Sequence, residues 1–249
     1  MSMKPERTVI VNADDFGLSH GINRGIIEAH ERGILTSASL MVRYEATHEA
    51  AEYARSHPRL GVGLHVDLGE WVCARGHWTP RYMVVQIDAK FPRHLDEIRR
   101  QLDRFRELVG REPSHLDSHQ HFHRREPVRS GTARIAVELG LPLREFTPAV
   151  WHCGHFYGQS ARGESYPELL SPEALARLLR KVPAGITELA CHPAAVVDFD
   201  SSYARERVLE RDALCDESVR EAVVEERIRL SSFDDLPAEE RRVFLPPGT

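Results

Sequence analysis

The sequence predicts an α/β fold, a distorted or incomplete (β/α) barrel of the TIM-like type in a single domain. Short apolar runs alternate with amphipathic helical stretches along the chain, which amounts to about seven strand-helix units. Histidine or aspartate follows several of the predicted strands, at the carboxyl ends where barrels carry their active sites. A doubly wound sheet is the alternative, but its glycine-rich phosphate-binding turn is missing after the first strand.

Length and composition are those of a soluble globular protein with a sizeable core. The 249 residues are 41% hydrophobic and 29% charged, and nothing near the middle reads as a linker, so we expect one domain over residues 1–249. A net charge of −5 gives no reason to expect nucleic acid or an anionic membrane as a partner. Composition leaves the oligomeric state open, and a homo-oligomer is compatible with it.

The sequence favours a cytoplasmic location. No apolar run is long enough to span a bilayer, and residues 1–7 lead into a strand without the apolar core of a secretory signal. The four cysteines are widely scattered and form no C-x-x-C pair, so neither a disulfide framework nor a cysteine zinc site is expected. A reducing compartment fits this cysteine usage best.

The first predicted strand begins at residues 9–11 and runs into an acidic turn. Asp14 and Asp15 follow it directly, and Gly17 marks the turn. If strand geometry persists, adjacent side chains point to opposite faces, so the two aspartates cannot do the same job. One could bind a metal while the other handles a proton. The alternative, weighted equally from these residues alone, is that both are turn or helix-capping residues.

The next elements repeat the strand-helix alternation. Ser19 is placed to cap a helix that ends at Gly33. Residues 35–42 then form a strand of small and apolar residues, and an Ala- and Glu-rich helix spans about residues 46–56. Pro58 stops that helix.

The third predicted strand, residues 60–68, alternates between apolar and polar positions. His65 and Asp67 share its polar face, which therefore carries an imidazole and a carboxylate. Residues 69–92 break the pattern and are expected to form an irregular excursion over the sheet. Its aromatic residues would suit stacking on a sugar face if exposed, and the alternative, at least as well supported, is that the tryptophans pack the loop onto the body.

The highest density of histidine and aspartate residues lies at residues 115–123, after a clear amphipathic helix at about residues 95–109. In an extended segment, polar side chains at every second position would share one face. They are His115, Asp117, His119, His121 and His123. Such a face is costly to bury without a divalent cation, so one or two of them should bind metal while the others orient ligands, handle protons or bind substrate. The alternative is a solvated turn that is rich in histidine.

The rest of the chain adds further strand-helix units. We expect a helix at residues 129–139, a short strand at 143–146 and an irregular stretch at 151–158. His152, Cys153 and His155 offer ligands for another zinc, but three such residues in a glycine-rich loop are more typical of a lid or packing element, so no second metal is predicted there.

The C-terminal part is expected to contain two strands and two helical regions. Ser171 caps a helix with proline in its first turn, and a strand at 186–191 ends in His192. A last helical region at about 203–226 precedes a strand at 228–230.

Four motifs in order resemble those of the YdjC-like carbohydrate deacetylases, a family that includes the chitooligosaccharide deacetylases. They lie at residues 12–17, 63–65, 115–123 and 191–193. Residues 156–158 also resemble a family loop near the substrate, less distinctively. The resemblance covers nearly the whole chain.

The resemblance implies a metal-dependent hydrolase on a distorted (β/α) barrel, which removes an acetyl group from an N-acetylated sugar. By position, Asp15, His65 and His119 match the metal ligands, Asp14 matches the catalytic base and His192 is placed as the acid. The remaining residues are assigned to substrate contacts or to the surroundings of the metal: His115, Asp117, His121, His123, Phe156 and Tyr157.

The chemistry of these residue types agrees with the implied reaction. Two imidazoles and one carboxylate leave coordination positions open for water and substrate, and the metal would acidify the water that attacks the acetamide. Such ligands suit Zn²⁺, while an oxygen-rich water shell would admit Mg²⁺, which is also associated with the family.

Two other functions were weighed against deacetylation. A metal-dependent phosphoesterase on a similar barrel would need a basic cluster aimed at a phosphate, and the sequence shows none. A catalytically silent sugar-binding protein would need none of the proton chemistry that Asp14 and His192 offer.

Overall fold

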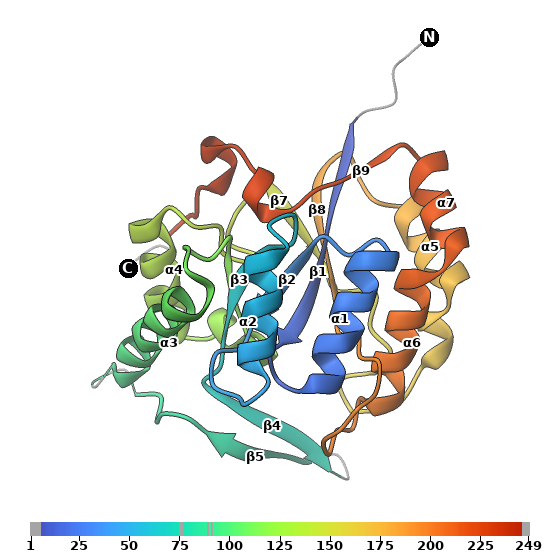
Figure 1. The fold of residues 1–249 in the computed structure, drawn as a ribbon. Coiled ribbons are helices and arrows are strands. Elements are labelled where there is room, and N and C mark those ends of the chain that lie inside the picture. Colours follow the sequence, from blue (N-terminus) through green and yellow to red (C-terminus); the bar gives the residue numbers. More distant parts are fainter. Residues whose placement is uncertain (1–5, 75–76, 89, 91, 246–249) are drawn as a thin grey trace.

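A curled sheet of parallel strands forms the centre of the protein (Figure 1). The computed structural model describes residues 6–74, 77–88, 90 and 92–245. The strands lie in the order β6, β3, β2, β1, β8, β7, and β9 pairs with β1 as the seventh. Their bounds are β1 Arg7–Phe16, β2 Ser37–Leu40, β3 Gly61–Val66, β6 Leu116–Ser118, β7 Val150–Cys153, β8 Gly185–Cys191 and β9 Ile228–Leu230.

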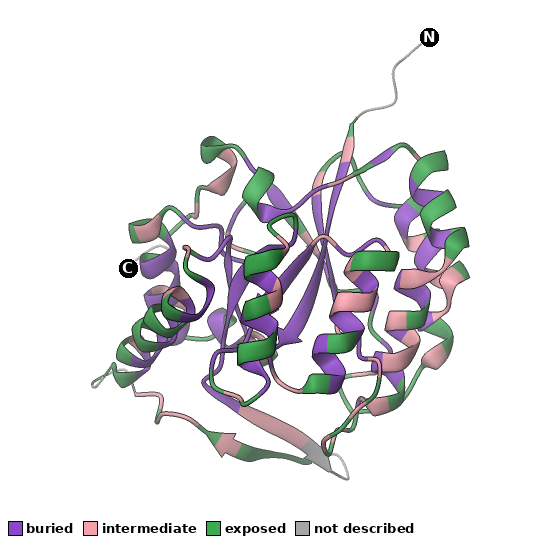
Figure 2. Cartoon of the chain, viewed as in Figure 1, coloured by how far each residue is buried: buried purple, intermediate pink, exposed green. Residues whose placement is uncertain are grey.

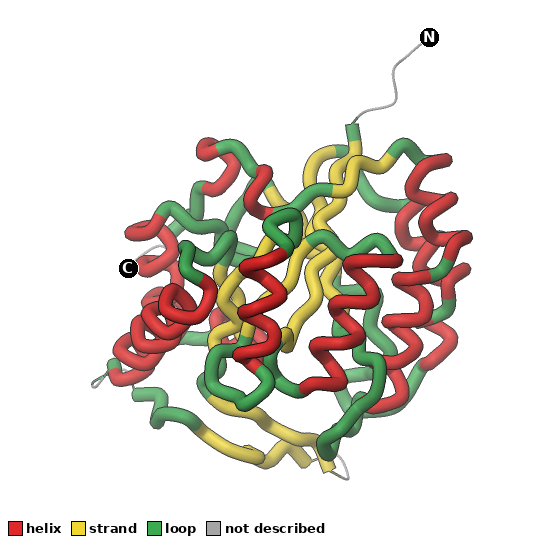
Figure 3. The backbone as a smooth tube through the Cα atoms, in the orientation of Figure 1, coloured by secondary structure: helices red, strands yellow, loops and turns green. Residues whose placement is uncertain are grey.

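Helices surround this sheet as an outer layer (Figure 3). Their bounds are α1 His20–Arg32, α2 Thr47–Ser56, α3 Arg93–Val109, α4 Val128–Leu139, α5 Pro172–Arg180, α6 Ala204–Cys215 and α7 Glu217–Glu225. Buried residues line the helix faces that meet the strands, and exposed residues lie on the outer faces (Figure 2). The predicted distorted or incomplete (β/α) barrel is therefore confirmed as the fold class.

Strand β1 is buried on both of its faces. Val9 and Val11 belong to the main hydrophobic core, whereas Ile10 packs on the other side with Phe233 and Leu236. Parallel strands covered on both faces are typically continuous apolar runs, which explains the three aliphatic residues at positions 9–11 of β1. Phe233 lies in η3 (Phe233–Asp235), a short 3₁₀ helix that closes the barrel interior from the C-terminal end of the chain.

A short connection at residues 143–149 joins the two edges of the sheet. The strand predicted at residues 143–146 is not formed. Only Leu143 bridges to Leu116 beyond β6, and residues 144–149 then lead into β7 at the opposite edge. Glu145 has a φ of 66°, in the left-handed region that ends a strand. The backbone turns here, so Arg144 enters the barrel from a turn.

Residues 69–92 contain a hairpin, so the expected irregular loop is only partly correct. Strands β4 (Gly69–Ala74) and β5 (His77–Met83) pair antiparallel and lie below the carboxyl ends of the sheet strands (Figure 1). Trp71 packs partly against the core, whereas Trp78 is 53% exposed. Residues 75–76, 89 and 91 of this segment lie outside the described residues, as do residues 1–5, where no secretory signal is predicted.

The polar segment at residues 115–123 is not extended throughout, which corrects the prediction. Strand β6 ends at Ser118, and η1 (His119–Arg124) follows as a 3₁₀ segment. Gln120 and His121 have φ values of 48° and 54°. These left-handed residues rotate the chain, so the alternate side chains no longer share one face.

Three further predictions concern the ends of elements. The expected caps are confirmed, since Ser19 Oγ accepts from Ile22 N and Ser171 Oγ accepts from Ala174 N. The helical region expected at about 203–226 is confirmed, but it consists of two helices, because Asp216 separates α6 from α7 and caps the second helix through the backbone N–H of Ser218. The stretch expected to be irregular from residue 151 begins as β7.

No helix among the described residues combines the length and the apolar character needed to cross a bilayer. This finding agrees with the absence of a long apolar run in the sequence. That one domain takes in all of residues 1–249 stays a prediction.

Candidate functional site

Polar side chains meet at the edge of the sheet formed by the carboxyl ends of the strands. Asp14 and Asp15 come from the end of β1, and His65 comes from β3. His119 follows β6 directly, and His192 follows β8. Because parallel strands end at one edge of a sheet, residues far apart in the sequence meet there.

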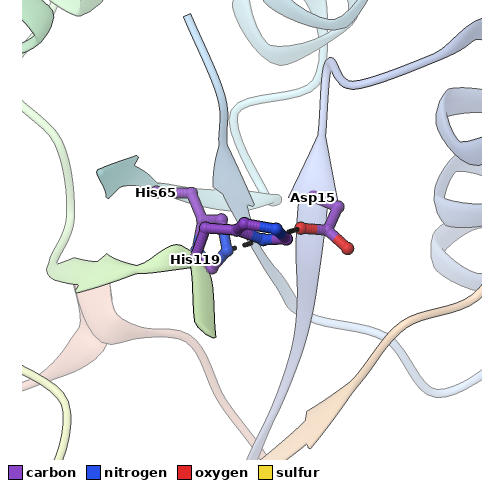
Figure 4. Close-up of side chains that lie close together, drawn as sticks. All are labelled: Asp15, His65 and His119. Carbon is purple, nitrogen blue, oxygen red and sulfur yellow. Dashed lines mark hydrogen bonds and ion pairs between the residues drawn. The ribbon is translucent and has the colours of Figure 1, made fainter. Parts of the chain in front are cut away.

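Asp15, His65 and His119 form a compact group of possible metal ligands (Figure 4). Asp15 Oδ1 lies 3.4 Å from His65 Nε2 and 3.0 Å from His119 Nδ1. One donor atom from each residue lies within 4.8 Å of the others. Asp15 and His65 are each only 1% exposed. Two imidazole nitrogens and one carboxylate oxygen at this spacing fit a single divalent cation with open positions.

The two adjacent aspartates separate because the backbone leaves strand geometry between them. The pairing of β1 with β2 shifts register between Ala13 and Phe16, and Asp15 has a φ of 68°. The Gly17 amide then donates to the Asn23 side chain at 2.7 Å, which fixes the turn. As a result Asp15 faces the two histidines, while Asp14 faces an arginine.

Arg207 on α6 holds Asp15 from the other side. Its Nη2 lies 2.6 Å from Asp15 Oδ2, and its side chain is almost fully buried. Burial alone would raise the pKa of Asp15, but the Arg207 guanidinium and His119 outweigh it and hold that pKa well below its usual range. Asp15 is therefore ionised, as a metal ligand must be. Sequence reasoning did not find Arg207, because a single arginine on a helix carries no local signal.

Asp14 is bound by Arg144, which is also buried. Arg144 Nη1 and Nη2 donate to the two carboxylate oxygens of Asp14 at 2.7 and 2.6 Å. The same guanidinium contacts Glu188 at 2.7 Å and Asp117 at 2.9 Å. Burial would raise the pKa of Asp14, but Arg144 lowers it to about 2, so Asp14 is ionised. Neither Arg144 nor Glu188 was found by sequence reasoning.

Asp117 orients His65. Its Oδ1 accepts a hydrogen bond from His65 Nδ1 at 2.7 Å, which leaves His65 Nε2 directed at Asp15. Histidines that bind metals commonly have such a carboxylate partner on the second nitrogen. Burial would lower the pKa of His65, but Asp117 and Asp14 raise it well above its usual range. These carboxylates favour positive charge at this point, whether the charge is a proton or a metal ion.

His115 lies deeper in the barrel than the other histidines. Its Nε2 is 3.0 Å from Ser39 Oγ, and its ring stacks on Phe233 at 3.9 Å. Ser39 in turn donates to Asp117 at 2.8 Å. A Cβ on Gly63 would lie 2.4 Å from the His115 ring, so only glycine fits at that position. His115 therefore supports the carboxylate that orients His65, and it is fully buried.

His121 and His123 belong to a second group with Glu145. One possible ligand atom of each residue lies within 4.8 Å of the others. Burial, together with the nearby Arg144 and Arg124, lowers the pKa of His121 to about 2. Burial and Arg144 lower the pKa of His123 to about 3. Both imidazoles are therefore uncharged at neutral pH.

His192 lies beside Asp14 at the rim of the site. Its Nε2 is 3.8 Å from Asp14 Oδ2, and its Nδ1 is 3.9 Å from the buried carboxyl group of Glu210. The His192 backbone N–H and the Tyr203 hydroxyl both donate to Glu210. Burial lowers the pKa of His192 to about 4 and raises that of Glu210 to about 8. Glu210 was not found by sequence reasoning.

The two aromatic residues of the predicted substrate loop have different surroundings. Tyr157 is 38% exposed, stacks on Tyr203 at 4.6 Å and meets the His192 ring at 5.5 Å. Phe156 is 1% exposed and packs in the core. Tyr157 is therefore available to a ligand, whereas the position of Phe156 favours a packing role. The cluster of His152, Cys153 and His155 does not appear among the metal-binding groups of the described residues.

Comparison with known proteins agrees with the motifs. The family described as "YdjC-like protein" matches residues 8–225. A chitooligosaccharide deacetylase of Salmonella paratyphi B is 35% identical, over 93% of this chain and 100% of that protein. A chitooligosaccharide deacetylase of Citrobacter koseri is 34% identical over the same shares.

Solved structures share the fold. A protein of Enterococcus faecalis V583 named for cellobiose-phosphate cleavage has a TM-score of 0.69 and 26% identity, over 92% of this chain and 98% of that one. A family 4 carbohydrate esterase from Streptomyces lividans in complex with acetate has a TM-score of 0.57 and 13% identity, over 98% and 100%. At 13% identity the second likeness shows the fold alone. The resemblance seen in the motifs is confirmed, and the chain belongs to the YdjC-like family.

Proposed function

We propose that this protein is a metal-dependent carbohydrate N-deacetylase, which hydrolyses the acetamide of a chitooligosaccharide or a related sugar that contains N-acetylglucosamine. One observation carries the proposal: Asp14 and His192 lie 3.8 Å apart at the edge that also holds Asp15, His65 and His119. The names of the relatives that are 34 and 35% identical support the same reaction.

The divalent cation would be held by Asp15, His65 and His119. When bound, it acidifies a water molecule and polarises the acetamide carbonyl. The donor set fits, since two imidazoles and one ionised carboxylate are ligands that Zn²⁺ prefers. We propose Zn²⁺ as the ion, with Mg²⁺ as the alternative.

Asp14 acts as the base in this proposal. Its carboxylate is ionised at neutral pH, and the two hydrogen bonds from Arg144 hold it in one orientation. A carboxylate whose pKa is about 2 is a weak base, so it needs a strongly acidified proton donor.

His192 carries the proton to the leaving nitrogen. It is uncharged at neutral pH and its Nε2 faces Asp14 Oδ2, so the proton that Asp14 accepts has a short path to the imidazole. Glu210, which accepts a hydrogen bond from the Tyr203 hydroxyl, lies next to His192 Nδ1 and supports the imidazole on that side. Donation from His192 to the nitrogen then completes the formation of acetate and an amine.

Tyr157 provides a surface for the sugar ring. It is partly exposed, and its stacking on Tyr203 holds the ring next to His192. Aromatic faces next to a catalytic edge suit the apolar faces of sugars.

A phosphoesterase activity is less well supported. Phosphate recognition needs available cationic side chains, yet both buried arginines of the site are already paired with carboxylates, Arg144 with Asp14 and Arg207 with Asp15. A silent sugar-binding protein would not need the Asp14 and His192 pair.

The test is acetate release from N-acetylglucosamine oligomers by protein treated with a chelator and then supplied with Zn²⁺ or Mg²⁺. We expect release only after a metal is added, with Zn²⁺ more effective. Phosphate release from sugar phosphates is measured in parallel, and sugar binding is compared between the wild type and Asp14→Asn. No acetate from any N-acetyl sugar, together with unchanged sugar binding, would support the silent binder.

We also propose that the protein acts in the cytoplasm on a small carbohydrate, without nucleic acid or membrane as partners. The scattered cysteines and the moderate net charge support this. Light scattering after gel filtration tests whether the chain forms a homo-oligomer.

A further inference from the structure

A second polar group lies next to the proposed catalytic site but is separate from it. It consists of His121 and His123 from η1 and Glu145 from the turn that precedes β7, and we call it the His121 group. The proposed chemistry of Asp14 and His192 uses none of these residues.

The two histidines of the His121 group carry nitrogen atoms that lack partners. Among the described residues, His121 Nδ1 and His123 Nε2 are buried without a hydrogen-bond partner. His123 is fully buried. Buried polar atoms are nearly always paired, and an unpaired one calls for a specific explanation such as an ordered water or an ion. Two of them in the same group point to one missing partner.

His123 is held in the orientation of a metal ligand. Its Nδ1 lies 2.7 Å from Ser118 Oγ, and Ser118 Oγ also accepts from the His123 backbone N–H at 3.0 Å. Its Nε2 is thereby aimed at Glu145, 3.9 Å from Oε2. This distance is too long for a hydrogen bond, and it leaves room for an ion between the two atoms.

We propose that the His121 group binds a second divalent cation of the zinc type, through His121 Nδ1, His123 Nε2 and Glu145. Zinc binds imidazole through an unprotonated nitrogen, and His121 Nδ1 and His123 Nε2 are the two ring nitrogens of the group that lack partners among the described residues. Two imidazoles and one carboxylate suit Zn²⁺ better than Mg²⁺ or Ca²⁺, which prefer oxygen ligands.

The role of this second cation is structural. It connects η1 with the turn at Glu145, and the residue before Glu145 is Arg144, which holds Asp14. Arg124 already pairs with Glu145 and competes for its carboxylate. We therefore expect the second ion to bind about tenfold or more weakly than the first.

The experiment counts zinc ions by calorimetric titration of the full chain after chelator treatment. Wild type should bind two Zn²⁺ per chain. Asp15→Asn/His65→Gln should keep the weaker site, and His121→Gln/His123→Gln should keep the tighter one. His48→Gln, a change at an exposed histidine on α2, is the matched control and should still bind two.

Thermal unfolding gives a second readout that does not depend on activity. Zn²⁺ should raise the melting temperature of Asp15→Asn/His65→Gln, because the second site binds only the folded chain. Circular dichroism checks that each variant is folded. If His121→Gln/His123→Gln does not fold, Glu145→Asp replaces it, because this change preserves the charge.

Binding of one Zn²⁺ per wild-type chain would overturn the second site. Binding of two Zn²⁺ with unchanged affinity by both His121→Gln/His123→Gln and Glu145→Asp would overturn it as well. These outcomes are independent of acetate release. A protein that binds two zinc ions but releases no acetate would contradict the proposed function and leave the second site standing.

Discussion

His119 and His121 are separated by one residue, yet they belong to two groups with different electrostatic surroundings. In the group of Asp15, His65 and His119, the neighbouring carboxylates Asp117 and Asp14 raise the pKa of His65 well above its usual range. The His121 group has arginines nearby, and burial with these arginines lowers the pKa of His121 to about 2. Residue type alone does not define a metal site, because the neighbouring charges decide how its side chains titrate.

Arg144 connects the two regions. It neutralises Asp14, Asp117 and Glu188 on one side, and it lowers the pKa values of both histidines on the other. Changes at Arg144 and at its partners therefore separate the two regions experimentally.

The largest effect is expected from Asp14→Asn. Loss of the base should lower kcat for acetate release about 10²–10⁴-fold, the usual contribution of general base catalysis. The metal ligands themselves are untouched, so zinc should still bind, but more weakly than to wild type, because one of the carboxylates that favour positive charge at His65 is lost. Steady-state kinetics on a chitooligosaccharide measure the first quantity and calorimetry the second.

The matched control for this variant is Asp103→Asn, an exposed aspartate on α3. It should leave kcat unchanged. Wild-type activity in Asp14→Asn would remove Asp14 from the mechanism.

Arg144→Met should destabilise the fold by about 3–5 kcal/mol, the usual result of removing one partner of a buried ion pair. Three buried carboxylates, Asp14, Asp117 and Glu188, would lose their shared cation. Urea unfolding measures the change. Arg144→Lys should lose less stability because it keeps the charge but not the two-pronged geometry. Equal stability of all three proteins would contradict this account.

The pH dependence of stability distinguishes the two regions. The pKa values of His121 and His123 in the folded protein, about 2 and about 3, lie below the ordinary 6.5. The folded protein therefore favours the uncharged imidazoles, and it loses stability as the pH falls below about 6.5 because the unfolded chain takes up protons first. Asp14 has a pKa lowered from 3.8 to about 2, so its contribution of about 2 kcal/mol is lost at lower pH, between about 4 and 2.

Urea unfolding in chelator at a series of pH values tests this order. His121→Gln/His123→Gln should flatten the dependence between about pH 6.5 and 3, and Asp14→Asn should flatten it only below about pH 4. Identical profiles for both variants would show that the two regions do not titrate separately.

The smallest effect is expected from Tyr157→Ala. Loss of a stacking surface worth about 1 kcal/mol should raise KM about fivefold and leave kcat little changed. Tyr166→Ala, at a tyrosine of similar exposure, is the control. A fall in kcat without a change in KM would instead give Tyr157 a role in positioning His192, whose ring it meets.

Sequence reasoning succeeded where local pattern and strand ends carry the information. The apolar run of β1, the strand predicted at residues 60–68 and found as β3, and the caps at Ser19 and Ser171 are local features, and they are seen in the structure. The family resemblance supplied the candidate residues Asp14, Asp15, His65, His119 and His192, which meet at one edge. Their catalytic roles stay predictions.

It failed where distant partners decide the outcome. Arg144, Glu188, Arg207 and Glu210 were missed, because each acquires its meaning only from a residue far along the chain. The alternation at residues 115–123 was misread as one extended face, since the left-handed turn at Gln120 and His121 has no signature in residue type. The hairpin β4–β5 was missed because its strands pair only with each other at the rim.

The position of β1 has a consequence for synthesis of the chain. β1 pairs with β2, which follows it directly, but also with β8 and β9, which are translated much later, so these two partners are missing while the ribosome makes the middle of the protein. A nascent or truncated chain would present an apolar strand with an open hydrogen-bonding edge, a template for aggregation. Productive folding must therefore wait for the last strand, and chaperones that shield the N-terminal strand would improve the yield of expressed protein.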